Sequence, residues 1–83
     1  SLKIAGEILL EAKDKSADFL IVQNKDDLLI FDGMQSQIQR VVNRDINLAI
    51  ITEEQFVMLL KGEKDIAKLG FDQHKVKVSF LNY

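Results

Sequence analysis

The side chains that could do chemistry in this chain gather in two short acidic segments and at one histidine. Asn24, Asp26 and Asp27 lie in the first segment, Glu54 lies in the second, and His74 is the one histidine of the 83 residues. Carboxylates of this kind can hold a hard cation such as Mg²⁺, which binds through one or two carboxylates and several waters. Paired carboxylates can also act as general acid and base. These five residues form the candidate site.

A structural role for the same residues is the interpretation that we favour. Acidic residues are preferred in the first turn of a helix, where they complement the positive end of the helix dipole. Each acidic segment precedes an apolar helical pattern, so its carboxylates suit such a turn. No serine or threonine nucleophile can be tied to His74 by spacing, and we expect His74 to lie at the surface or to cap a helix.

Other kinds of chemistry are excluded by the residue types that the chain lacks. It has no cysteine, and so it offers no thiolate for a nucleophile, a zinc site or an iron–sulfur cluster. One histidine cannot supply the multi-histidine shell of a catalytic zinc ion. Neither acidic segment has the glycines of a phosphate-binding loop, and its carboxylates would repel a phosphate. We therefore expect neither nucleotide binding nor any cofactor.

The balance of charges argues against nucleic acid as a partner. Lys and Arg number 11 and Asp and Glu number 13, for a net charge of −2. This composition gives no basic surface for nucleic acid or for an anionic membrane. No apolar run approaches the ~20 residues that span a bilayer. We expect a cytoplasmic protein of ordinary globular composition.

The candidate residues must be positioned by short helices and strands within one small domain, because 83 residues leave no room for a second domain. Apolar residues at helical spacing predict the helices, and two runs of branched apolar residues predict buried strands. Thr52 and Gln55 form a capping box, and Gly33 predicts a kink or a break. The expected elements are helix 2–15, strand 19–22, helical segment 28–42, strand 46–51, a helix that begins after Thr52 and stops at Gly62, a helical turn over 66–69 and strand 75–81.

This order predicts an α/β fold with a parallel βαβ core, arranged α-β-α-β-α, and a short additional strand at the C-terminal end. In open α/β sheets, ligands bind beyond the carboxyl ends of the strands. Segments 24–27 and 52–55 should therefore lie at the same edge of the sheet. We expect residues 1–83 to form a single domain that is a fragment of a larger chain.

The order and spacing of several short motifs resemble the C-terminal cysteine-rich module of the heterodisulfide reductase protein HdrB. The iron–sulfur proteins of succinate dehydrogenase and glycolate oxidase carry related modules. The resemblance covers residues from about Leu2 to Val76. Its motifs are Ser16-Ala17-Asp18 before the first strand, Phe31-Asp32 with Gln35 on a helix, Gln55-Phe56-Val57-Met58-Leu59-Leu60-Lys61-Gly62 after the second strand, and Leu69-Gly70-Phe71-Asp72-Gln73-His74.

One departure from that family bears directly on function. Its Cys-Pro-x-Cys turn falls on Asn24 and Asp27 here, with Lys25 in place of the proline. The family uses its cysteines to hold an unusual iron–sulfur cluster for disulfide or electron-transfer chemistry, and none of those ligands carries over. The resemblance therefore implies a degenerate module that has kept the core pattern and lost the cluster.

The first hypothesis is a non-catalytic structural or interaction module that assists assembly of a larger protein or redox complex. Its expected partner is another domain of the same chain, a separate protein, or a second copy that forms a homodimer. The alternative is a small-ligand or metal-dependent enzyme that uses Asp26, Asp27, Glu54 and His74. A third hypothesis is a redox scaffold whose cluster ligands come from a partner chain.

Overall fold

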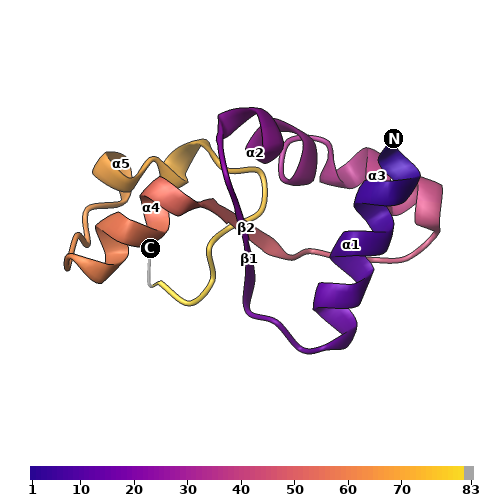
Figure 1. Ribbon diagram of the computed structural model, residues 1–83, viewed down its shortest axis with the longest axis horizontal. Coiled ribbons are helices and arrows are strands. Elements are labelled where there is room, and N and C mark those ends of the chain that lie inside the picture. The colour runs from indigo at the N-terminus through magenta and orange to yellow at the C-terminus, as the bar shows by residue number, and fades with distance from the viewer. Residues whose placement is uncertain (82–83) are drawn as a thin grey trace.

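The computed structural model describes residues 1–81 and alternates helices with two short strands (Figure 1). The two strands cross the middle of the molecule, with α1 and α3 on one side and α4 and α5 on the other. The elements are α1 (Leu2–Asp14), β1 (Phe19–Val22), α2 (Lys25–Phe31), α3 (Gln35–Val42), β2 (Ala49–Thr52), α4 (Glu53–Leu60), α5 (Ile66–Leu69) and the 3₁₀ helix η1 (Phe71–Gln73).

The two strands pair in parallel, as the sequence predicts. Phe19 lies opposite Ala49, and the register continues to Val22 opposite Thr52. The chain between the strands runs through α2 and α3, because parallel neighbours need a long crossover. Both strands therefore end at the same edge, and each leads into a helix there. The predicted α/β fold with a βαβ core is confirmed.

Strand β2 separates two hydrophobic cores. Its side chains alternate between faces, so Ile50 joins the core formed with α1 and α3, while Ile51 joins the core formed around Phe71. Ile50, Ile51 and Phe71 are all fully or almost fully buried. All four residues of β2 are buried, as expected for a strand covered on both faces.

The segment expected as one helical span over 28–42 is two helices. The first begins at Lys25, because Asn24 caps it: the Asn24 side-chain oxygen accepts a hydrogen bond from the Asp27 N–H at 2.9 Å. The break falls at Gly33, where a Cβ atom would overlap the backbone carbonyl of Leu29. A side chain at this position would therefore disturb the junction of α2 and α3.

The second strand is shorter than expected, because it begins at Ala49 instead of Ile46. Asn47 has a left-handed backbone with φ of 50°, which interrupts an extended chain. The Gln39 side-chain oxygen accepts hydrogen bonds from the Ile46 and Asn47 N–H groups at 2.7 and 3.1 Å. These backbone groups are thus bound by a helix side chain and not by a neighbouring strand.

The strand predicted over 75–81 is wrong: these residues form turns and bends. The Lys75 and Val76 N–H groups donate to the carboxylate of Asp32, and the Leu81 N–H closes a turn onto the Val78 carbonyl. Val78 is fully buried, which accounts for the apolar alternation, but the described sheet contains β1 and β2 alone and does not include this segment. The alternation of apolar and polar residues over 75–81 therefore reflects the burial of one side chain, Val78, within a loop.

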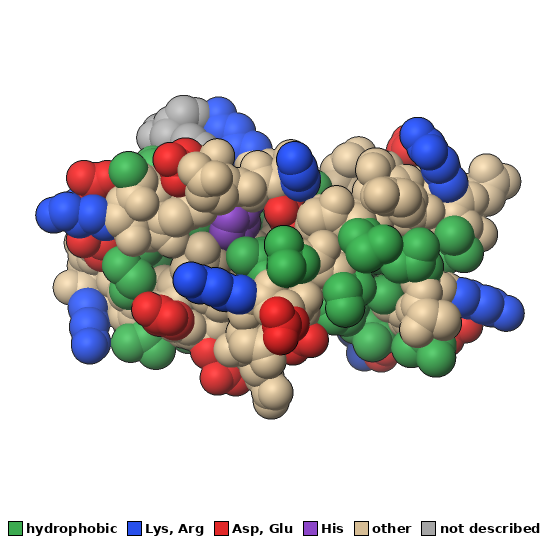
Figure 2. Space-filling model, turned by 90° about the horizontal axis from the view of Figure 1, so that it is seen from above, with side chains coloured by type: hydrophobic (Ala, Val, Ile, Leu, Met, Phe, Trp, Pro, Cys, Tyr) green, Lys and Arg blue, Asp and Glu red, His purple; other side chains and the backbone are tan. Residues whose placement is uncertain are grey.

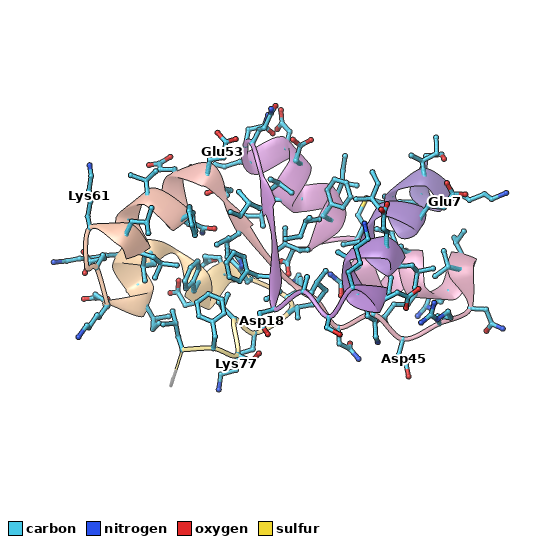
Figure 3. The ribbon with its side chains drawn as sticks, turned by 60° about the horizontal axis from the view of Figure 1, so that its bottom comes forward. Glu7, Asp18, Asp45, Glu53, Lys61 and Lys77 are labelled. Atoms are coloured by element: carbon cyan, nitrogen blue, oxygen red, sulfur yellow. The ribbon has the colours of Figure 1, made fainter. Side chains whose placement is uncertain are left out.

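Charges of both signs are spread over the surface (Figure 3), with Glu7 on α1, Glu53 at the start of α4 and Lys61 just after it. Over residues 1–81, the helices are too short or too polar for any of them to cross a membrane.

Candidate functional site

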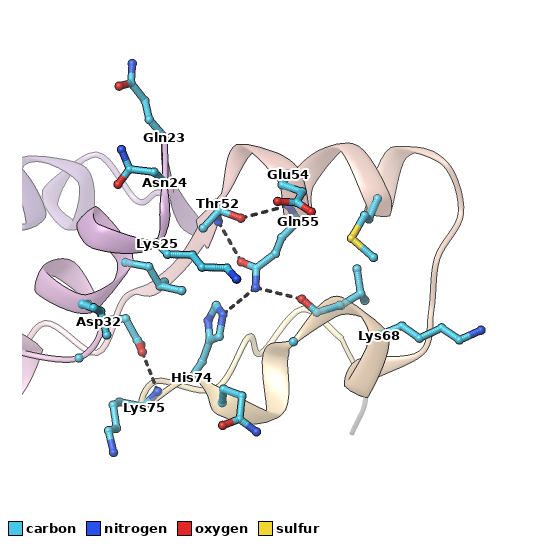
Figure 4. Close-up of a pocket in the computed structure, with 17 residues that line it drawn as sticks. Gln23, Asn24, Lys25, Asp32, Thr52, Glu54, Gln55, Lys68, His74 and Lys75 are labelled. Atoms are coloured by element: carbon cyan, nitrogen blue, oxygen red, sulfur yellow. Dashed lines mark hydrogen bonds between the residues drawn. The ribbon is translucent and has the colours of Figure 1, made fainter.

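A cavity of about 740 Å³ opens at the carboxyl ends of the two strands. Its walls come from α2, α4 and the segment from Lys68 to Lys75 (Figure 4). In the space-filling view, the histidine side chain lies at the bottom of a hollow in the same part of the molecule (Figure 2). The cavity thus occupies the edge of the sheet at which the sequence places the candidate residues.

Three of the five candidate residues line this cavity, namely Asn24, Glu54 and His74. Asp26 and Asp27 are not among the lining residues; they lie in the first turn of α2, where acidic residues favour the helix dipole. Asn24 is the N-cap of the same helix. The structure therefore does not bring together the four acidic and histidine side chains that the enzyme hypothesis would use.

Gln55 links three segments at the floor of the cavity through the hydrogen bonds of its side-chain amide. Its Oε1 accepts a hydrogen bond from the Thr52 N–H at 2.9 Å, and the Thr52 hydroxyl accepts one from the Gln55 N–H at 3.1 Å, which completes the predicted capping box. Its Nε2 donates to the Leu69 carbonyl at 3.0 Å and lies 3.0 Å from His74 Nε2. The Thr52 N–H at the amide oxygen and the Leu69 carbonyl at the amide nitrogen thus fix the orientation of the Gln55 amide.

The orientation of the Gln55 amide determines which ring nitrogen of His74 carries the proton. Because Gln55 presents an NH₂ group, His74 Nε2 must be the acceptor, so the proton of the neutral ring is on Nδ1. Burial lowers the pKa of His74, while the charges of Asp32 and Asp72 and the backbone of Ile50 oppose that shift. Nδ1 is itself buried and makes no hydrogen bond of normal geometry within the described residues. Burial and the amide donor of Gln55 both favour the neutral ring over the protonated one.

Asp32 is a buried carboxylate that sequence reasoning did not place in the site. It is 4 % exposed and lines the cavity from the C-terminal end of α2. Its two oxygens accept the Lys75 N–H at 2.8 Å and the Val76 N–H at 2.9 Å. Both oxygens are thus engaged by backbone donors, and Asp32 holds the segment after His74 against the start of the α2–α3 junction.

Gln35 has a similar structural role on the other side of the sheet. Its side-chain oxygen accepts the Leu48 N–H at 3.0 Å, and its Nε2 donates to the Leu48 carbonyl at 2.9 Å and the Phe31 carbonyl at 3.0 Å. The sequence carried a signal for Asp32 and Gln35, because both lie in a motif shared with the resembled family. Their spacing alone does not reveal that they bind the backbone.

The residues at the strand ends do not suit a metal ion or an iron–sulfur cluster. Within residues 1–81, no three histidine, aspartate or glutamate side chains are grouped so that they could hold a metal. At the turn where the family has its cysteines, the Asn24 oxygen is engaged as a helix cap and the Lys25 side chain points into the cavity (Figure 4). Iron–sulfur clusters are held by thiolates, and this turn offers an amide, an ammonium group and two carboxylates.

Comparison with known proteins agrees with this geometry. A crystal structure of a hypothetical protein from Helicobacter pylori superposes on the chain with a TM-score of 0.86 at 27% sequence identity, covering 96% of this chain and 16% of that one. The chain matches none of the curated proteins. The sequence model of the HdrB-like C-terminal domain matches residues 1–75. The chain therefore belongs to the HdrB-like C-terminal domain family.

Proposed function

We propose that this domain is a non-catalytic module that keeps the packing of a cluster-binding domain and supplies an assembly surface to a larger protein. The observation that carries the proposal is the use of Asp32, Gln35 and Gln55. These three polar residues lie in the motifs shared with the family, and each one binds backbone groups within the fold. They stabilise the scaffold, since a buried polar group left without a partner costs roughly 1–3 kcal/mol.

An exposed apolar surface supports the assembly role. Ile4 and Ile8 on α1 are 59% and 43% exposed, and Leu29 and Ile30 on α2 are 66% and 40% exposed. Hydrophobic side chains gather over the half of the molecule that carries α1, α2 and α3 in Figure 2. We name Ile4, Ile8, Leu29 and Ile30 the α1–α2 surface. Contiguous apolar surface of this kind marks interaction sites on soluble proteins.

We propose that another domain of the same polypeptide covers the α1–α2 surface. The matched part of the Helicobacter pylori protein is only 16% of that chain, and the family is described as a C-terminal domain. Both facts favour a module that folds beside further domains of one longer polypeptide. The cytoplasmic location that we expect from the sequence is part of this proposal.

The non-catalytic role is tested by anaerobic reconstitution. The purified chain is incubated with iron and sulfide, desalted, and assayed for bound iron and visible absorption. We expect no stoichiometric cluster, because the chain has no thiolate ligand. A variant with Asn24→Cys and Asp27→Cys is the matched comparison, since it restores thiols at the strand end. A stoichiometric cluster on the original chain would overturn the proposal.

The assembly role is tested on the intact polypeptide, expressed as two pieces, this domain and the remainder. We expect the pieces to co-elute as a 1:1 complex. Ile4→Glu should weaken that complex by at least about tenfold, a change of roughly 1.4 kcal/mol. Leu60→Glu is the control, because Leu60 is 71% exposed but lies on α4. Equal effects of the two substitutions, a homodimer of the isolated domain, or a gene that encodes no further domain would each contradict this assignment.

A further inference from the structure

Most hydrogen-bond acceptors that line the cavity already have partners. The side-chain oxygens of Asn24, Thr52 and Gln55 accept backbone N–H groups, and so do both oxygens of Asp32. His74 Nε2 accepts from the Gln55 amide. Among the described residues, the side-chain acceptors of the lining that make no such bond are those of Gln23, Glu54 and Gln73, so the acceptors around Gln55 and His74 are already occupied.

The lysine side chains that line the cavity, in contrast, form no ion pairs with described residues. These lysines are Lys25, Lys68 and Lys75. In Figure 4, the side chain of Lys25 points toward Gln55 and His74, whereas Lys68 and Lys75 point outward from the rim. The cavity thus presents an inward-pointing cation, Lys25, whose N–H donors bind no acceptor among residues 1–81.

The rest of the lining is largely apolar. Leu28, Met58 and Leu69 contribute to the walls, and the volume of about 740 Å³ lies within the range of small-molecule sites. Such sites combine apolar walls with a few polar groups that fix the orientation of the ligand. We propose that this cavity binds a small organic anion, with an apolar body between these side chains and a carboxylate at Lys25.

Of the two carboxylates that line the cavity, Asp32 is engaged by backbone donors and Glu54 is not. Glu54 lines the cavity at the start of α4, it is exposed, and no described residue binds its carboxylate. A negative charge there opposes an incoming anion and so limits the affinity. This gives the proposal a second, opposite test, because removing the Glu54 charge should strengthen the binding of an anion.

The probe is hexanoate, titrated into the ¹⁵N-labelled chain at constant ionic strength and followed by the backbone amide signals. We expect saturable shifts near Lys25 and Gly70, and weaker binding of 1-hexanol, which has the same apolar body without the charge. Lys25→Met should weaken hexanoate binding by about threefold to fivefold, as for an ion pair at an exposed site. Glu54→Gln should strengthen it by about twofold.

The control is Lys3→Met, because Lys3 is exposed on α1 and does not line the cavity. This variant should bind hexanoate like the original chain, and well-dispersed amide spectra show that each variant is folded. Hexanoate that fails to saturate, hexanol that binds as tightly, or equal losses in Lys25→Met and Lys3→Met would each overturn the proposal. This test is independent of assembly, because it uses the 83-residue chain without a partner.

Discussion

The side chains of Gln55 and His74 meet through their Nε2 atoms, 3.0 Å apart, with the amide as donor and the imidazole as acceptor. The amide cannot turn over, because its oxygen binds the Thr52 N–H and its nitrogen binds the Leu69 carbonyl. A protonated His74 would place an N–H group against this NH₂ group. The capping box of α4 and the neutral state of the histidine are therefore coupled.

Gln55→Glu should make the protonated form of His74, and not the neutral form, the favoured one. A glutamate keeps the capping box, since one carboxylate oxygen can still accept the Thr52 N–H. Its other oxygen would face His74 Nε2 as an acceptor and favour the protonated ring. We expect the pKa of His74 to move from below its ordinary value of 6.5 to above it, measured by NMR titration of the ring protons.

The same variant should lose stability at alkaline pH. A carboxylate oxygen would face the Leu69 carbonyl, and that buried acceptor would lose its hydrogen bond, at a cost of about 1–3 kcal/mol. Gln55→Met serves as a comparison, because it removes the bond to Leu69 without adding a charge, although it also loses the capping-box bond from Thr52. A His74 pKa that stays below 6.5 in Gln55→Glu would refute the assigned orientation of the amide.

The free energy of unfolding should fall as the pH drops below 6.5, the ordinary pKa of histidine. The folded pKa of His74 is lowered, so the unfolded chain binds a proton first and is favoured in this window. One proton gives at most about 1.4 kcal/mol per pH unit, and less here because the half-buried ring is partly screened by solvent.

Urea denaturation at several pH values measures this effect, with His74→Gln as the variant that cannot titrate. The exposed carboxylates of Glu11 and Asp14 also have lowered pKa values, but their effect begins only near 4.5 and 3.8. The original chain and His74→Gln should therefore diverge between pH 6.5 and about 5. Parallel curves in that interval would contradict the burial of a neutral imidazole.

Ile50→Ala should cost about 2–5 kcal/mol, because Ile50 is fully buried in β2 and its loss leaves a cavity between the strands and α1. Leu20→Ala should cost less, since Leu20 is only partly buried although it is the strand partner of Ile50. Chemical denaturation of the two variants gives the comparison. Equal losses would mean that β1 is buried as deeply as β2.

Gly6→Ala should destabilise the domain even though alanine is favoured over glycine inside a helix by about 1 kcal/mol. Helices α1 and α3 approach closely at Gly6, where a Cβ atom would overlap the side chain of Val42. Adding Val42→Ala should recover part of the loss, which a double-mutant cycle measures as a coupling energy. If Gly6→Ala raised the denaturation midpoint, the close approach would be absent.

The local elements were predictable because each one carries its own signal. Phe19–Val22 is a short branched run, Thr52 and Gln55 are three residues apart, and Gly33 interrupts a helical pattern. The positions of the two strands and their parallel pairing follow from such signals. Contacts within a few residues establish the caps and the helices, whereas the parallel pairing joins residues 30 apart, such as Phe19 and Ala49, and follows from the helical crossover between the two strands.

The floor of the cavity was not predictable, because its contacts join residues far apart in the chain. Asp32 binds Lys75 and Val76 across 43 and 44 residues, and Gln55 reaches His74 across 19. No local pattern distinguishes a buried aspartate with two backbone donors from an exposed one in a helix. The same long-range bonds turned the expected C-terminal strand into a loop.

Strand β2 has one hydrophobic core on each face, so it belongs to both halves of the molecule: the lobe with α1 and α3, and the lobe around Phe71. Unfolding the lobe around Phe71 would expose Ile51 and leave Ile50 without the backing that holds it against α1. Cooperative units of this kind open together, as small domains usually do. Splitting the chain between β2 and α4 would therefore not yield two independent pieces, and heat should melt both lobes in one calorimetric transition.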